Sequence, residues 1–125
     1  MKKILIVDDD LEMAQIMGDV LERASYQPLF ASDGIQAIQK TKREKIDLIL
    51  LDIKMPFFSG FWFCDAFKQR PETRDIPIVV VSGLPAEENS QKAFDLGASY
   101  YLKKPFRPAE LLDVVDRHLS SGIQK

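Results

Sequence analysis

The chain has 125 residues, of which 46% are hydrophobic and 29% charged, with a formal net charge of −2. That length is enough for one hydrophobic core and too short for two ordinary domains, and the composition is typical of a soluble globular protein. The near balance of charge gives no electrostatic reason to expect binding to nucleic acid or to an anionic membrane. The single cysteine, Cys64, excludes an internal disulfide.

The start of the chain resembles a signal peptide only superficially. Two lysines precede the apolar run at residues 4–7, but this run is shorter than the ~7–15 residues of a signal core, and three aspartates follow it. No apolar stretch approaches the ~20 residues of a membrane-spanning helix. We therefore expect a cytoplasmic protein without a membrane contact.

The first part of the chain alternates a short apolar run with an amphipathic segment, twice. Residues 3–7 are predicted to form a buried strand, and the carboxylate of Asp10 can cap the helix predicted over residues 11–24. A weaker strand is predicted over residues 27–31, and Asp33 and Gly34 introduce a second helix. The apolar residues expected to face inward from these two helices are Ala14, Met17, Leu21, Ala24, Ile35, Ala37 and Ile38.

The same alternation continues to the end of the chain. Further strands are predicted over residues 46–51, 76–81 and 99–102, and further helices over residues 61–69, 86–96 and 108–119. Gly97 is expected to end the fourth helix. Five strands that alternate with five helices predict an α/β fold with one parallel sheet and helices on both faces. We expect one domain over residues 1–120, followed by a tail or the start of a linker over residues 121–125.

Polar side chains follow four of the five predicted strands. Asp8 and Asp9 follow the first strand, Asp52 the third, Ser82 the fourth and Lys104 the fifth. Because ligands of an open parallel sheet bind at the carboxyl ends of its strands, we expect these side chains to converge. Three carboxylates in one place repel one another unless a cation neutralises them, and an all-oxygen site suits Mg²⁺. A metal ion, an ammonium and a hydroxyl around one carboxylate form a site for a phosphoryl group, with an aspartate as nucleophile.

In their order and spacing, several short segments resemble the receiver domains of bacterial two-component response regulators. The resemblance covers residues 3–119 and implies a flavodoxin-like sheet of five parallel strands in the order 2-1-3-4-5. It also implies a phosphorylation-controlled signalling switch rather than an enzyme that turns over outside substrates. The matching segments are residues 4–10 (ILIVDDD), 47–56 (DLILLDIKMP), Gly60, 77–83 (PIVVVSG), 97–98 (GA) and 100–106 (YYLKKPF).

The resemblance implies a metal-binding role for the acidic residues. Asp52 would accept the phosphoryl group and also bind Mg²⁺. Asp9 would be a second direct ligand and the backbone carbonyl of Lys54 a third. Asp8 would act mostly through a bound water.

The resemblance also implies how the phosphoryl group is held and sensed. Ser82 would hydrogen-bond it, and Lys104 would pair with it, aimed into the pocket by a cis bond to Pro105. Lys103 is the rival for this role, but it does not directly precede the proline. Tyr101 would be the switch residue that turns inward when Ser82 moves toward the phosphoryl group.

The resemblance also implies two kinds of partner, one that donates the phosphoryl group and one that responds to it. A histidine kinase or a phosphotransfer protein would donate the phosphoryl group, and a downstream protein or an attached output domain would respond to it. A homodimer is also compatible with the resemblance. No direct binding of nucleic acid by this segment is expected, because the sequence supplies no recognition helix.

The segment around the third helix is unusually aromatic. Six aromatic residues in eleven positions exceed what one amphipathic helix can bury on a single face. Phe61 and Phe67 could pack the helix onto the sheet. We expect Phe57, Phe58 and Trp62 to be exposed and to form a surface for a partner or for self-association.

Two other functions are alternatives to a signalling switch. A pseudo-receiver would keep the fold without the chemistry, which the intact pocket positions disfavour. A Mg²⁺-dependent phosphatase usually carries a second aspartate two residues after its nucleophile, where this chain has Lys54.

In the receiver family, the positions of Lys54 and Leu84 flank the path of the attacking water, so we expect slow self-dephosphorylation.

Overall fold

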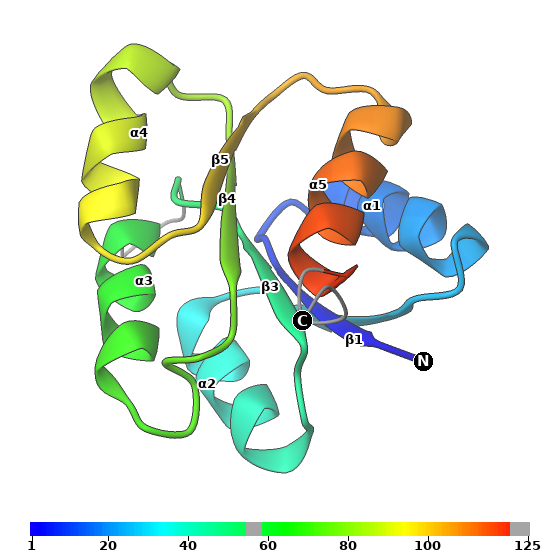
Figure 1. Ribbon diagram of the computed structural model, residues 1–125, viewed down its shortest axis with the longest axis horizontal. Helices are drawn as coiled ribbons and strands as arrows, with labels where there is room; N and C mark the ends of the chain where they lie inside the picture. Colours follow the sequence, from blue (N-terminus) through cyan, green and yellow to red (C-terminus); the bar gives the residue numbers. More distant parts are fainter. Residues whose placement is uncertain (55–58, 121–125) are drawn as a thin grey trace.

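Five parallel strands form a single sheet, and five helices cover its two faces in this computed structural model, which describes residues 1–54 and 59–120 (Figure 1). The order of the strands in the sheet is β2-β1-β3-β4-β5, so the predicted fold and strand order are confirmed. The strands are β1 (Lys3–Val7), β2 (Gln27–Ala31), β3 (Leu48–Leu51), β4 (Ile78–Ser82) and β5 (Tyr100–Lys103). The helices are α1 (Leu11–Arg23), α2 (Gly34–Arg43), α3 (Gly60–Gln69), α4 (Ala86–Asp95) and α5 (Pro108–Ser120).

The central strands are buried on both faces, because successive side chains point to opposite sides of the sheet. In β1, Leu5 and Val7 belong to the core under α2, α3 and α4, whereas Ile4 and Ile6 belong to the core under α1 and α5 (Figure 1). Such strands appear in a sequence as continuous apolar runs. The edge strand β2 leaves Phe30 40% exposed, which explains why its sequence signal is weaker.

Two short polar side chains start helices as expected. An Asp10 carboxylate oxygen accepts the backbone N–H groups of Glu12 and Met13, both at 3.1 Å. An Asp33 carboxylate oxygen accepts the N–H of Gln36 at 2.8 Å. These bonds satisfy N–H groups that have no partner inside the helix, so they fix where α1 and α2 begin.

Two residues predicted to face inward do not. Ile35 is 56% exposed, because it lies two positions before the buried Ala37, which places it on the opposite side of the helix. Ala24 is exposed because α1 ends at Arg23, so that Ala24 is already the cap residue. The start of β4 also differs by two residues, since Pro77 has no N–H for the strand ladder.

Two other strands differ from the prediction by one or two residues, since β3 begins at Leu48 rather than at residue 46 and β5 is Tyr100–Lys103 rather than residues 99–102. Gly97 follows α4 with a φ of +105°, a left-handed conformation that favours glycine. Helix α5 ends at Ser120, and the expected tail, residues 121–125, lies outside the described residues. Within the parts of the chain that the structure describes, every helix is too short or too polar to cross a membrane.

Cys64 provides a test of this packing. Its side chain is fully buried in α3, with the sulfur 3.7 Å from the carbonyl oxygen of Leu96, and burial raises the pKa of the thiol to about 11. We expect iodoacetamide near pH 8 to alkylate the native protein far more slowly than the urea-unfolded protein, as followed by mass spectrometry. Equal rates in the two states would contradict the buried position.

Candidate functional site

The carboxyl ends of β1 and β3 bring three carboxylates together. The two strands pair in parallel with Val7 beside Leu51, and the Asp52 N–H donates to the Val7 carbonyl at 2.9 Å. One oxygen from each of Asp8, Asp9 and Asp52 lies within 4.8 Å of the others. Asp8 and Asp52 are buried, whereas Asp9 is exposed. The structure therefore assembles the acidic cluster that the sequence places at the strand ends.

Lys104 faces this cluster with a single positive charge. Its ammonium nitrogen lies 3.5 Å from a carboxylate oxygen of Asp8 and 3.9 Å from one of Asp52. The Lys104-Pro105 peptide bond is cis. Lys103 is exposed, and its ammonium donates to the Lys104 carbonyl at 2.8 Å. Of the two neighbouring lysines, it is thus Lys104 that pairs with the carboxylates.

Backbone N–H groups hold the two buried carboxylates in place. Asp8 Oδ1 accepts the N–H of Asp10 at 2.9 Å, and Asp52 Oδ1 accepts the N–H of Lys54 at 3.0 Å. The second oxygen of each carboxylate is the one that lies near Lys104. The side chain of Lys54 is exposed. Each buried carboxylate is therefore oriented by a fixed donor on one oxygen.

The surroundings of Asp52 disfavour its charged form. Burial raises the pKa of Asp52 to about 6, against the lowering effects of the Lys54 N–H and the Lys104 ammonium, and the Asp8 carboxylate raises it as well. One ammonium cannot balance three carboxylates. The donor set, which consists of carboxylate oxygens close together, matches the hard oxygen ligands that Mg²⁺ prefers. Asp8, Asp9 and Asp52 could thus hold a divalent cation.

Ser82 and Tyr101 are joined through the backbone of one residue. The buried Ser82 accepts the Leu84 N–H on its hydroxyl oxygen at 3.0 Å, and the Tyr101 hydroxyl donates to the Leu84 carbonyl at 2.9 Å. Tyr101 is 8% exposed, so its ring is buried in this structure, and its role as a switch stays a prediction. The sequence gives no signal for the role of Leu84, because nearly any residue could supply these backbone groups.

Helix α3 begins directly against the segment that follows β3 and carries Asp52. The Gly60 N–H donates to the Ile53 carbonyl at 2.9 Å. A Cβ atom at position 60 would lie 2.3 Å from the Ile53 Cα and 2.6 Å from the Asp52 carbonyl oxygen. Glycine is therefore required here by the close approach of two backbones.

The aromatic residues of α3 divide between the core and the surface. Phe63 and Phe67 are buried, and Phe61 is half-buried beneath the Lys92 ammonium, which lies 4.5 Å from the ring centre. Trp62 is 58% exposed, as predicted. Phe57 and Phe58 lie outside the described residues, and the use of this surface by a partner stays a prediction.

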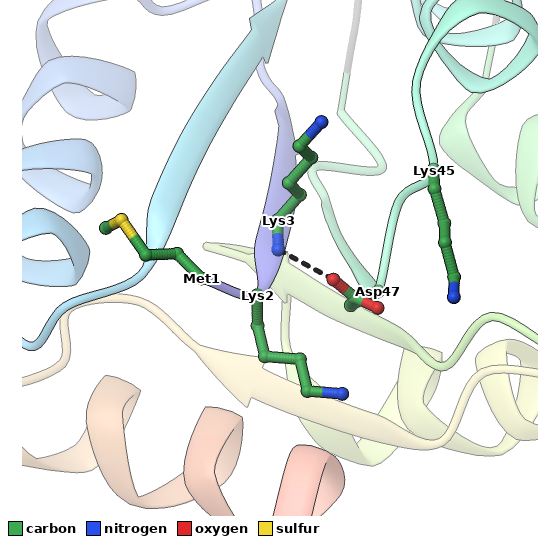
Figure 2. Close-up of a pocket in the computed structure, with 5 residues that line it drawn as sticks. All are labelled: Met1, Lys2, Lys3, Lys45 and Asp47. Carbon is green, nitrogen blue, oxygen red and sulfur yellow. Dashed lines mark hydrogen bonds between the residues drawn. The ribbon is translucent and has the colours of Figure 1, made fainter.

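A hollow at the opposite edge of the sheet has the reverse charge. It lies at the amino ends of β1 and β3 and is lined by the side chains of Met1, Lys2, Lys3, Lys45 and Asp47 (Figure 2). One carboxylate oxygen of Asp47 accepts the Lys3 N–H at 2.8 Å. With its single carboxylate already engaged, this hollow lacks the clustered oxygens of the other edge. The carboxyl edge is therefore the candidate site for metal and phosphoryl chemistry.

Comparison with known proteins points to one family. The model of the response regulator receiver domain matches residues 4–116. Among solved structures, the chemotaxis protein CheY4 of Vibrio cholerae is similar with a TM-score of 0.90 and 33% identity, covering 95% of this chain and 99% of that one. The receiver domain of a Pseudomonas aeruginosa sensor histidine kinase has a TM-score of 0.87 and 27% identity, covering 96% and 98%. That structure carries a magnesium ion coordinated in its active-site cleft.

Curated relatives are longer proteins. The phosphate regulon transcriptional regulatory protein PhoB of Escherichia coli is 36% identical over 111 residues, which are 89% of this chain and 48% of PhoB. The alkaline phosphatase synthesis transcriptional regulatory protein PhoP of Bacillus subtilis is 36% identical over 110 residues, which are 88% and 45% of the two chains. The chain therefore spans about half the length of the curated relatives it matches.

The close contact at Gly60 predicts a specific sensitivity. Replacing Gly60 with alanine should destabilise the protein by about 1–3 kcal/mol, because the new methyl group must push the backbone at Asp52 and Ile53. Gly83→Ala is the matched control, since a Cβ there meets nothing within 4 Å. Urea unfolding followed by circular dichroism measures both variants. A Gly60→Ala protein as stable as Gly83→Ala would overturn this account.

Proposed function

Because the chain belongs to the response regulator receiver domain family, whose members are phosphoacceptor signalling modules of two-component systems, we propose that Asp52 is the residue that accepts the phosphoryl group. The observation that carries this proposal is the position of its carboxylate. It is buried, lies beside two further carboxylates, and is 3.9 Å from the Lys104 ammonium. Asp8 and Asp9 follow the neighbouring strand, where they would bind the metal ion rather than accept the phosphoryl group.

The acidic residues would hold Mg²⁺, as the Pseudomonas receiver domain does in its cleft. Asp9 and Asp52 would bind the ion directly together with the backbone carbonyl of Lys54, and Asp8 through a water. A bound Mg²⁺ supplies positive charge that neutralises the phosphoryl oxygens. The clustering of three carboxylate oxygens supports this assignment.

The phosphoryl donor would be a phosphohistidine of a histidine kinase or a phosphotransfer protein. A carboxylate oxygen of Asp52 attacks the phosphorus, the bond between phosphorus and the imidazole nitrogen breaks, and the imidazole leaves with the bonding electrons. Lys104 and the hydroxyl of Ser82 stabilise the charge on the phosphoryl oxygens. This reaction fits a cytoplasmic protein in which residues 1–120 form the receiver domain.

The response would pass from Ser82 to Tyr101. When the Ser82 hydroxyl turns toward the phosphoryl group, the Leu84 N–H loses its acceptor, and the loop that also holds the Tyr101 hydroxyl is free to move. The populations of the existing conformations of the surface formed by α4, β5 and α5 would then shift. A downstream protein, an attached output domain or a second copy of the chain would read this change.

Labelling with acetyl phosphate tests the proposed acceptor. We expect a Mg²⁺-dependent, base-labile phosphoryl adduct on the wild-type protein and none on Asp52→Asn, as measured by intact-mass spectrometry. Asp33→Asn is the matched control, because Asp33 caps α2 outside the site and should leave labelling intact. Labelling of Asp52→Asn at the wild-type level would remove Asp52 from this role.

The lifetime of the phosphoryl adduct on Asp52 tests whether the side chains of Lys54 and Leu84 obstruct the water that hydrolyses it. Lys54→Ala and Leu84→Ala should lose the phosphoryl group about two- to fivefold faster, because less side chain obstructs the attacking water. The Leu84 backbone bonds to Ser82 and Tyr101 do not depend on its side chain. Lys103→Ala, which removes an exposed lysine outside the carboxylate cluster, should keep the wild-type half-life. Unchanged half-lives in the first two variants would refute the obstruction.

A further inference from the structure

The turn between β1 and α1 carries three consecutive aspartates, and the proposed chemistry uses only the first two, Asp8 and Asp9. The third, Asp10, directs its carboxylate to the helix, where it accepts the N–H groups of Glu12 and Met13, both at 3.1 Å. The backbone N–H of the same Asp10 donates to Asp8 Oδ1 at 2.9 Å. One residue therefore joins the first turn of α1 to a buried carboxylate of the site.

The hydrogen bond from the Asp10 N–H to Asp8 closes a ring that contains Asp9. An aspartate that accepts the N–H two residues further on forms an Asx turn, which restricts the backbone of the residue between them. Asp9 is exposed, so neighbouring side chains give it little support beyond this turn. Asp8 is 1% exposed, and its carboxylate has one oxygen on the Asp10 N–H and the other near Lys104. The positions of both carboxylates therefore depend on the direction of the Asp10 N–H.

Helix α1 sets that direction. The Ala14 N–H donates to the Asp10 carbonyl at 2.9 Å, so both the carbonyl and the carboxylate of Asp10 are bonded to the helix. The helix in turn is fixed on the sheet, because Ala14, Met17 and Leu21 are buried in the core beneath it. Without the Asp10 carboxylate, two N–H groups of the first turn would have no partner within the helix, and this turn would fray. Asp10 thus connects a helix packed on the core to the acidic cluster.

Asp33 provides a comparison within the same chain. It also follows a strand, β2, and caps the next helix by accepting the Gln36 N–H at 2.8 Å. The neighbouring Ser32 N–H donates to the Gln36 side-chain oxygen at 2.9 Å. Among the residues that the structure describes, the hydrogen bonds of this cap do not reach the acidic cluster. The two aspartates therefore share a capping role, but only Asp10 also contacts a carboxylate of the site.

We propose that Asp10 is a positioning residue of the Mg²⁺ site: by capping α1, its carboxylate fixes the N–H that orients Asp8 and the turn that carries Asp9. This inference rests on the proposed function, because it concerns how the metal ligands of that site are held. Mg²⁺ requires a nearly ideal octahedral geometry, and hydrogen bonds that orient ligands from outside strongly affect metal affinity. Asp10 itself stays on the helix, so its hydrogen-bonding oxygen matters and its charge does not.

Titration of the isotope-labelled full chain with Mg²⁺, followed by backbone amide NMR signals at constant ionic strength, tests this role. Asp10→Ala should weaken the affinity for Mg²⁺ about tenfold, because the turn that carries the ligands loses its support. Asp10→Asn removes the same charge but keeps an oxygen that caps the helix, so its affinity should stay within about twofold of the wild type. Asp33→Ala is the matched control, since it removes an equal charge and an equivalent cap and should keep the wild-type affinity.

The comparison of the three variants separates the possible causes. Equal Mg²⁺ affinities of Asp10→Ala and Asp33→Ala would show that Asp10 only caps the helix, and would overturn the proposal. Equal weakening in Asp10→Ala and Asp10→Asn would assign the effect to charge and would overturn it as well. A wild-type protein that binds no Mg²⁺ would remove the proposed metal site and this inference together. Mg²⁺ binding and labelling of Asp52 in the wild type, with unchanged binding in Asp10→Ala, would refute the role of Asp10 alone.

Discussion

Three carboxylates within 4.8 Å of one another, two of them buried, repel strongly because little water screens them. The parallel register of β1 and β3 imposes this arrangement, since it ends both strands at the same edge. Lys104 offsets only part of the repulsion, and the pKa of Asp52 is raised chiefly because its carboxylate is buried, with a smaller contribution from the Asp8 carboxylate. The carboxyl ends of β1 and β3 thus carry negative charge that Lys104 does not fully compensate. A cation or a phosphoryl group bound there would change the repulsion among the three carboxylates.

The two sides of Asp52 differ in how firmly they are held. On the α3 side, Gly60 places one backbone against another, and no side chain can adjust without moving the strand. On the β4 side, Ser82 and Tyr101 are connected by hydrogen bonds to Leu84, which can be exchanged for other partners at small cost. A change of charge at Asp52 therefore meets a close backbone contact in one direction and a replaceable set of hydrogen bonds in the other, so the proposed response would follow the second direction.

Much of this arrangement is predictable from the sequence, and the exceptions share a cause. The buried central strands, the caps at Asp10 and Asp33, and the convergence of the polar strand ends follow from local patterns. The exposure of Ile35 was missed because an apolar residue in a short helix does not reveal which face is covered. The bridging role of Leu84 depends on its backbone groups, which leave no signature in residue type, and the contact of the Phe30 ring with Gly18 joins segments whose approach the sequence does not reveal.

The lysines around the hollow at the amino ends of the strands (Figure 2) have a consequence for how the molecule moves in solution. Cationic side chains gather at one end of the strands and three clustered carboxylates at the other, so charge is unevenly distributed along the sheet. The field of an approaching charged partner exerts a torque on such a distribution and favours one orientation before contact. A net charge of only −2 conceals this property, because orientation during a diffusional encounter depends on where the charges lie and weakens as added salt shortens their range.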